Sequence, residues 1–175
     1  MAEMGVAAWV SRPEMEHILA ALMPANRLAV RVAMHTGLRI GDVLRLRPRD
    51  LRTSRPTVRE SKTGKTRRIS LPRDLLEELR RESGDYWVFE SRTDPRKHRT
   101  RQAVYKDIKR AAAVFQRTGA VRRCQVSTHT ARKIAAVDAY HKGGMAAAQR
   151  LLNHSDPAIT ALYALADQIG GINHG

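Results

Sequence analysis

Apolar residues recur at spacings of three and four along most of this chain of 175 residues, and this spacing is typical of amphipathic helices. Only 5% of the residues are aromatic, so the core must consist of Leu, Ala, Val, Ile and Met. The length suits one compact domain and is short for two. The helical stripes are Ile18, Leu19 and Leu22; Leu75, Leu76 and Leu79; Val104, Ile108, Ala111 and Phe115; Ile134 and Val137; and Ile159, Leu162, Leu165 and Ile169.

Capping and breaking residues divide the N-terminal part into helices. Ser11 and Glu14 have the spacing of a capping box, and Pro24 is expected to end the helix that they begin. A second helix is predicted over 26–35, stopping at Thr36 and Gly37, where glycine can take the left-handed C-cap conformation. A third is predicted over 40–46 and ended by Pro48. Pro72 is expected to open a further helix.

Between these helical regions the pattern changes to short extended segments. Residues 57–58 and 68–71 flank the turn-like tetrapeptide 62–65, which predicts a small β-hairpin. Residues 86–89 suggest another short strand, and 91–100 a charged loop. The predicted fold class is therefore mainly α with a small antiparallel β-sheet (α+β).

Helix is predicted again from Arg101 onward. One helix is expected to follow Gly143 and Gly144 and to run through Leu152. A last helix is expected to start at Asp156 and Pro157.

The chain carries 32 Lys and Arg against 17 Asp and Glu, a formal net charge of +15. Such an excess favours a polyanionic partner, because lysines and arginines that neutralise phosphates release condensed counterions. Acidic membranes or acidic proteins are alternatives. Two basic runs, 45–73 and 92–110, favour a DNA-facing surface over a merely solvated one, and the first of them contains the predicted hairpin.

Cys124 is the only cysteine, which excludes an intramolecular disulfide and a cluster of thiolate metal ligands. The N-terminus does not have the pattern of a signal peptide, and no apolar stretch reaches membrane-spanning length. These features predict a soluble protein of the reducing cytoplasm with no membrane partner.

Several side chains suit chemistry on a phosphodiester. His129 and Arg132 share one face of a predicted helix, and His154 and Tyr163 follow. A tyrosine phenol can attack phosphorus, arginines can hold the charged oxygens, and lysine or histidine can move protons. Taken alone, each residue has a plainer reading, such as a semi-buried core tyrosine for Tyr163.

The order and context of these residues resemble the catalytic domain of the tyrosine recombinases of the phage-integrase family. Thr36-Gly37-Leu38-Arg39 resembles the first box, with Asp42 at the position of a supporting acid. Ser61 to Lys65 resembles the hairpin with the catalytic lysine, and His129 to Arg132 the second box. Leu152 to Thr160 followed by Tyr163 resembles the third, and the match runs from about Ser11 to Asp167.

The resemblance implies a role for each residue. Arg39 and Arg132 would clamp the scissile phosphate, and Tyr163 would attack it to give a 3′-phosphotyrosine. Lys62, with Lys65 as the alternative, would protonate the leaving 5′ oxygen. His129 would act as acid and base, and His154 would hydrogen-bond the phosphate. Further contacts with double-stranded DNA are expected from Lys65, Arg67, Arg68 and Lys133. No metal or other cofactor is expected.

The chain also departs from the family pattern. Its first predicted helix begins within a dozen residues of Met1, so we expect one catalytic domain over 1–175 that lacks the N-terminal core-binding domain. Asn153 stands where the family commonly has glycine. The expected function is site-specific recombination by a protein that is monomeric when free and tetrameric on paired DNA sites. A DNA-binding or regulatory relic and a type IB topoisomerase are the alternatives.

Overall fold

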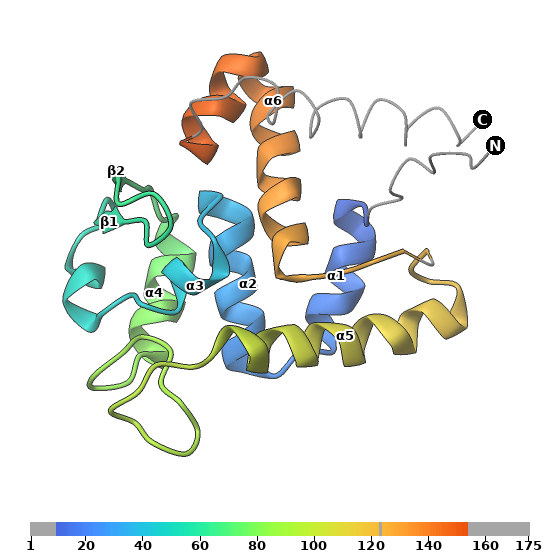
Figure 1. Cartoon of the computed structure of the whole chain (residues 1–175), viewed down its shortest axis with the longest axis horizontal. Coiled ribbons are helices and arrows are strands. Elements are labelled where there is room, and N and C mark those ends of the chain that lie inside the picture. The colour runs from blue at the N-terminus through green and yellow to red at the C-terminus, as the bar shows by residue number, and fades with distance from the viewer. Residues whose placement is uncertain (1–9, 123, 154–175) are drawn as a thin grey trace.

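The computed structural model of the protein describes residues 10–122 and 124–153. The described part is mostly helical with one two-stranded antiparallel sheet, as the sequence predicts (Figure 1). Its elements in chain order are α1 (Arg12–Ala20), α2 (Pro24–Thr36), α3 (Ile40–Val43), the 3₁₀ helix η1 (Pro48–Arg52), β1 (Thr57–Arg59), β2 (Thr66–Arg68), α4 (Arg73–Glu82), α5 (Arg101–Thr118) and α6 (Thr128–Leu152).

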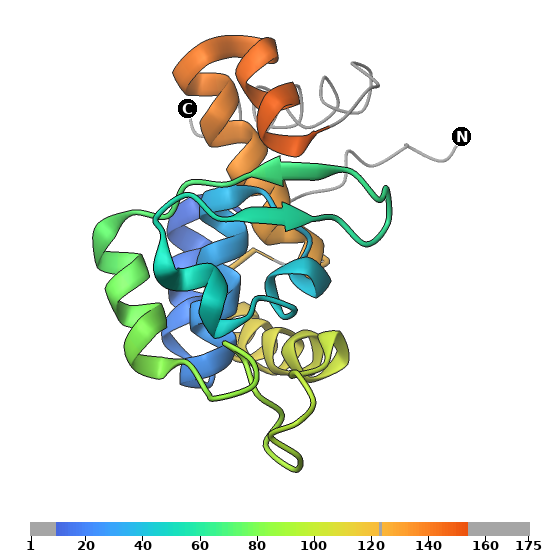
Figure 2. The ribbon, with the colours of Figure 1, turned by 90° about the vertical axis from the view of Figure 1, so that its left-hand side faces the viewer.

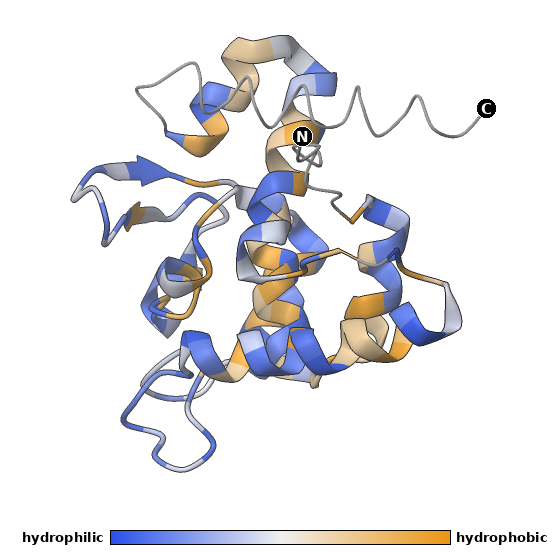
Figure 3. Cartoon of the chain, turned by 45° about the vertical axis from the view of Figure 1, so that its right-hand side comes forward, coloured by the Kyte–Doolittle hydropathy of each residue, from blue (hydrophilic) through white to orange (hydrophobic). Residues whose placement is uncertain are grey.

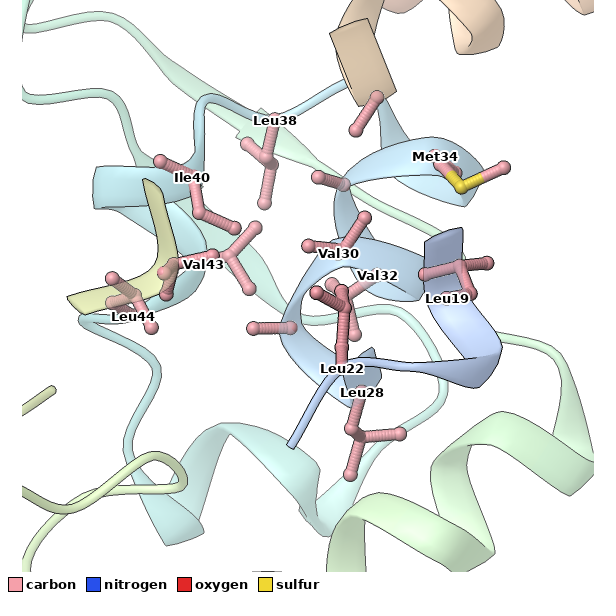
Figure 4. Packing of buried hydrophobic residues seen from close by; sticks show 14 of the residues in the cluster. Leu19, Leu22, Leu28, Val30, Val32, Met34, Leu38, Ile40, Val43 and Leu44 are labelled. Carbon is pink, nitrogen blue, oxygen red and sulfur yellow. The ribbon is translucent and has the colours of Figure 1, made fainter. Parts of the chain in front are cut away.

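Helix α2 lies at the centre of the described part and packs against α1, α3, α4 and α6. Its apolar side chains meet those of α1 and of the α2–α3 turn in one continuous core (Figure 4). Leu38, directly before Arg39, and Val43, four residues after it, are fully buried in this core. The hydropathy of the ribbon shows the same division, with apolar residues along α2 and hydrophilic ones in the hairpin and in the loop before α5 (Figure 3). The core thus fixes the backbone on both sides of Arg39.

The predicted capping box of the first helix is confirmed. The Ser11 hydroxyl accepts a hydrogen bond from the Glu14 backbone N–H, and the Glu14 carboxylate accepts one from the Ser11 N–H. Pro24 does not merely end this helix, because it also occupies the first turn of α2. A proline fits there since the first N–H groups of a helix have no partner within the helix.

The third predicted helix is shorter than expected. Helix α3 ends at Val43 because the N–H groups of Arg45 and Leu46 turn back to carbonyls three residues earlier. This tighter pattern is that of a 3₁₀ turn. Pro48 lies beyond the turn and opens η1, so it does not terminate α3.

The predicted hairpin is present, although its second strand begins and ends earlier than expected. Thr57, Val58 and Arg59 of β1 pair with Arg68, Arg67 and Thr66 of β2 (Figure 2). Ile69 still donates to the carbonyl of Pro56, but proline has no N–H to donate in return. The regular ladder therefore stops at Arg68, short of the predicted 68–71.

The prediction of a short strand at 86–89 is wrong. This segment is a turn in which the N–H of Tyr86 donates to the Glu90 carboxylate and the N–H of Gly84 to the Trp87 carbonyl. Glu90 forms an isolated bridge with His98. Val88 and Phe89, which suggest a strand, are buried in the core, and the Arg47 guanidinium lies 3.3 Å from the centre of the Trp87 ring.

Helix α6 runs from Thr128 to Leu152 with a kink at Gly143 and Gly144, where the backbone leaves helical geometry. The sequence places the same break at this pair of glycines. Asn153 caps the helix in the left-handed conformation, at φ 52°. Asparagine tolerates this conformation better than most residues, so it can stand where the family commonly has glycine. The helix predicted to start at Asp156 lies outside the described residues.

No helix within the described ranges is both long enough and apolar enough to cross a membrane.

Candidate active site

Arg39 lies in the turn between α2 and α3, and the local sequence fixes its position. Gly37 ends α2 in the left-handed conformation at φ 69°, and Arg39 is the N-terminal cap of α3. The Arg39 guanidinium donates from Nη1 to Oε2 of Glu60 at 2.8 Å. The side chain of Arg39 stays 19% exposed, while that of Glu60 is fully buried. The first box is thereby attached to the end of strand β1.

Glu60 also pairs with a second arginine from the hairpin. Its Oε1 lies 3.0 Å from Nε of Arg67. The same guanidinium donates from Nη2 to the carbonyl of Thr36 at 3.0 Å and from Nη1 to the carbonyl of Leu151. Burial lowers the pKa of Arg67 from its ordinary value, and the charge of Glu60 opposes that effect. Arg67, predicted to contact DNA, thus has its guanidinium directed into the protein.

Asp42 anchors the base of the hairpin loop. Its buried carboxylate accepts hydrogen bonds from the N–H of Ser61 at 2.9 Å and from the Ser61 hydroxyl at 2.7 Å. Lys62 is the next residue and is exposed. The loop closes through the N–H of Gly64, which donates to the Glu60 carbonyl at 2.8 Å. Lys62 therefore lies on a short exposed loop whose base is fixed to α3.

Arg132 is buried, and its guanidinium links two distant backbone segments. Nη1 donates to the carbonyl of Gly37 at 2.5 Å, and Nη2 to the carbonyl of Leu152 at 2.8 Å. Arginine suits this arrangement because its planar group presents several N–H donors in fixed directions. Arg132 thus fastens the turn that carries Arg39 to the C-terminal end of α6.

His129 lies in the first turn of α6, which Ser127 caps by accepting a hydrogen bond from the His129 N–H. Partial burial lowers the pKa of the imidazole from its ordinary value, and four cations act in the same direction. These cations are Arg101, Arg132, Lys133 and Arg39. The site therefore favours a neutral imidazole, which is the form that can accept a proton.

The remaining basic residues of the predicted site differ in exposure. Lys65 and Arg68 are exposed on the hairpin, whereas Lys133 is partly buried on α6. These positions are compatible with phosphate contacts from the hairpin.

The structure brings together residues from all the predicted boxes that it describes. Arg39, Asp42, the loop of Lys62, His129 and Arg132 are joined by the hydrogen bonds and charge interactions given above. His154 and Tyr163 lie outside the described residues. Within the described residues, no cluster of three or more His, Cys, Asp or Glu could hold a metal ion.

Sequence reasoning missed two residues of the site, Glu60 and Arg101. Glu60 is one of only two acids in the basic run 45–73, which is a signal that it has basic partners inside the fold. Arg101 belongs to the second basic run, but only the fold places it beside His129.

Known proteins resemble this chain over most of its length. The model of the phage integrase family matches residues 8–168. The chain is 33% identical over 141 residues to the probable integrase/recombinase YoeC of Bacillus subtilis (strain 168), an alignment that covers 77% of this chain and 74% of YoeC.

Solved structures share the fold at lower identity. A lambda integrase fragment (75–356), a dimer bound to a COC′ core site, matches with a TM-score of 0.72 and 23% identity over 90% of this chain. XerA recombinase matches with a TM-score of 0.73 and 18% identity over 99%. The chain spans 59% of the lambda integrase fragment and 66% of XerA. The chain therefore belongs to the phage integrase family, and its fold is that of a tyrosine recombinase catalytic domain.

Proposed function

We propose that this chain cleaves and rejoins duplex DNA through a covalent 3′-phosphotyrosine at Tyr163. The observation that carries the proposal is the hydrogen bond from Arg132 to the Gly37 carbonyl, which joins the second box to the turn of Arg39. A pair of guanidiniums suits a phosphate whose nonbridging oxygens gain charge during substitution, because each can donate hydrogen bonds to those oxygens.

In the proposed reaction, the phenolic oxygen of Tyr163 attacks the scissile phosphorus while the bond to the 5′ oxygen breaks. The neutral His129 accepts the phenolic proton, and Lys62 donates a proton to the leaving 5′ oxygen. His154 hydrogen-bonds the phosphate. Rejoining reverses these steps, with a 5′ hydroxyl as the nucleophile. The phosphotyrosine preserves the energy of the broken bond, so no cofactor or nucleotide is consumed.

The DNA partner follows from the charge and from the relatives. The net charge of +15 favours duplex DNA, and the lambda integrase dimer was solved on a core site. A lambda integrase tetramer was solved on a Holliday junction. We propose that this chain is monomeric when free and that it forms a tetramer on paired sites, as the lambda integrase does on a Holliday junction.

Trapping of the covalent intermediate tests the proposed function. The protein is incubated with a pool of nicked duplexes with a randomised centre, from which the short 5′-hydroxyl strand diffuses away after cleavage. We expect an adduct that survives denaturing gels and that Tyr163→Phe abolishes. Tyr105→Phe, an exposed tyrosine on α5, is the matched control and should form the adduct normally. If the Tyr163→Phe variant still forms the adduct, Tyr163 is not the nucleophile. If the unaltered protein forms no adduct, the result favours a DNA-binding relic.

A further inference from the structure

Glu60 is a fully buried carboxylate between two guanidiniums, Arg39 at 2.8 Å and Arg67 at 3.0 Å. A buried charge is tolerated only when it is paired, because transfer from water is costly. The same cost applies to the buried charges of Arg39 and Arg67, which need a negative partner. Without the carboxylate, the two largely buried guanidiniums would lie near each other with no negative charge between them. The charge of Glu60 is therefore a condition for Arg39 and Arg67 to occupy their observed positions.

The partners of Glu60 connect it to the rest of the site. Arg67 hydrogen-bonds the carbonyls of Thr36 and Leu151, which lie at the C-terminal ends of α2 and α6. Arg39 follows α2 directly, and the segment of the predicted third box begins at Leu152. A single carboxylate thus lies between the phosphate-binding arginine and the side chain that holds the two helix ends.

The residue after Glu60 attaches to the same short helix. Ser61 binds the Asp42 carboxylate through both its N–H and its hydroxyl. Consecutive hairpin residues therefore bind two side chains of the α3 segment, Arg39 and Asp42, immediately before Lys62. This double attachment restricts both the guanidinium and the base of the lysine loop.

We infer that Glu60 is a positioning residue that orients Arg39 toward the scissile phosphate through its ionised carboxylate. The inference rests on the proposed function. Glu60 accepts a hydrogen bond from one nitrogen of the Arg39 guanidinium, and the Arg39 side chain stays 19% exposed, so a phosphate can reach it. Glu60 itself is fully buried, so it acts through Arg39 and not on the DNA.

The test is a double-mutant cycle on the rate of adduct formation at saturating DNA, with the duplex pool that the unaltered protein cleaves. Glu60→Gln keeps the shape of the side chain and removes its charge. We expect the rate to fall about 10–100-fold, the range found when a partner that orients a functional group is removed from metal sites. Duplex affinity should change much less, because many other phosphate contacts remain. In an Arg39→Ala background, Glu60→Gln should have no further effect.

Glu78→Gln is the matched control, because it removes the charge from the Arg31–Glu78 ion pair between α2 and α4. It should leave the rate unchanged. If Glu60→Gln fails to fold, Glu60→Asp takes its place in both backgrounds. Aspartate keeps the carboxylate but is one methylene shorter, so the carboxylate no longer reaches Arg39 in the same way. An unaltered rate in the Glu60 variant, or an equal loss with and without Arg39, would overturn the inference.

A second readout separates this inference from the proposed function. The rise in melting temperature caused by inorganic phosphate at constant ionic strength is measured for the same four proteins of the cycle. We expect Glu60→Gln to reduce this rise only when Arg39 is present. Equal reductions in both backgrounds would overturn the positioning role. The comparison decides the point even if the unaltered protein forms no adduct, in which case the proposed function alone fails.

Discussion

The carbonyl oxygen of Gly37 accepts a hydrogen bond from Nη1 of Arg132 at 2.5 Å. Gly37 also lies against the C-terminal end of α6, where a Cβ atom at this position would come within 2.9 Å of Cγ of Leu151 and 3.1 Å of its carbonyl oxygen. Its φ of 69° is left-handed, which disfavours other residues independently of space. Both the conformation and the close approach therefore require glycine.

Gly37→Ala is expected to destabilise the protein more than Gly119→Ala. Gly119 has a similar φ of 78°, but no atom within 4 Å of a Cβ placed there. Gly119→Ala should lower the free energy of unfolding by about 1–2 kcal/mol, the cost of placing a residue with a Cβ atom in the left-handed conformation. Gly37→Ala should cost about 1–3 kcal/mol more, because it overpacks the contact with Leu151. Denaturant unfolding of the two variants measures the difference, and equal losses would disprove the close approach.

Lys62 is expected to be the general acid, and Lys65 to contribute mainly to DNA binding. Lys62 follows the Ser61 anchor, whereas the Lys65 carbonyl already accepts the N–H of Glu60 at 2.9 Å on the return to β2. Lys62→Ala should slow cleavage about 10²–10⁴-fold, the usual range for loss of proton transfer. A sulfur in place of the 5′ bridging oxygen should restore the rate, because a thiolate leaves without protonation. If sulfur instead restores the rate of Lys65→Ala, Lys65 is the general acid.

The pKa of His129 is expected to lie below the ordinary histidine value of 6.5, because burial and nearby cations disfavour the imidazolium. Arg101→Gln removes one cation and should raise this pKa toward 6.5. NMR titration of the imidazole measures the change. Arg49→Gln, a surface change on η1 that is not among the groups acting on His129, is the control. An unchanged pKa of His129 in Arg101→Gln would contradict the placement of Arg101 near His129.

Glu14 is expected to make the stability depend on pH in the acid range. Burial is the largest influence and raises its pKa, but hydrogen bonds from Ser11 and Arg122 outweigh it and lower the pKa from 4.5 to about 2. Because the folded pKa is the lower one, this stabilisation is complete above 4.5 and is lost as the pH falls toward 2.

Glu14→Gln should therefore cost about 1–3 kcal/mol at neutral pH, the usual loss for hydrogen bonds to a charged group. It should also flatten the dependence of stability on pH between 4.5 and 2. The free energy of unfolding is measured across this range. Glu16→Gln, on the same helix and more exposed, is the control and should keep the slope. If the dependence of stability on pH is unchanged in Glu14→Gln, Glu14 is not its origin.

The parts of the fold that depend on local chemistry could be predicted from the sequence. The Ser11–Glu14 capping box, the left-handed stop at Gly37 and the break at Gly143 each depend on a few neighbouring residues. The Pro24 and Pro48 predictions failed in part for the opposite reason. A proline can either end a helix or begin the next one, and the residues around it decide which.

The sequence predicts the residue types of the candidate site but not the contacts between them. The motifs indicated Arg39, Lys62, His129 and Arg132 without reference to any fold. The inward direction of Arg67 depends on carbonyls of Thr36 and Leu151 that only the packing of α2 against α6 brings near. The ion pair of Glu60 with Arg39 likewise joins the residue after β1 to the turn before α3, and no spacing in the sequence encodes this pairing.

The hydrogen bonds that close the site have a consequence for the order of events during synthesis. Arg132 and Gly37 are 95 residues apart, and Arg67 and Leu151 are 84 apart. Contacts of such sequence separation form late, because the intervening chain must first be ordered. A nascent chain on the ribosome therefore exposes its basic hairpin well before Arg132 can bind the Gly37 carbonyl. If the chain cuts DNA as proposed, that capacity arises only after Arg132 and Tyr163 have been added, which is well after the hairpin is complete.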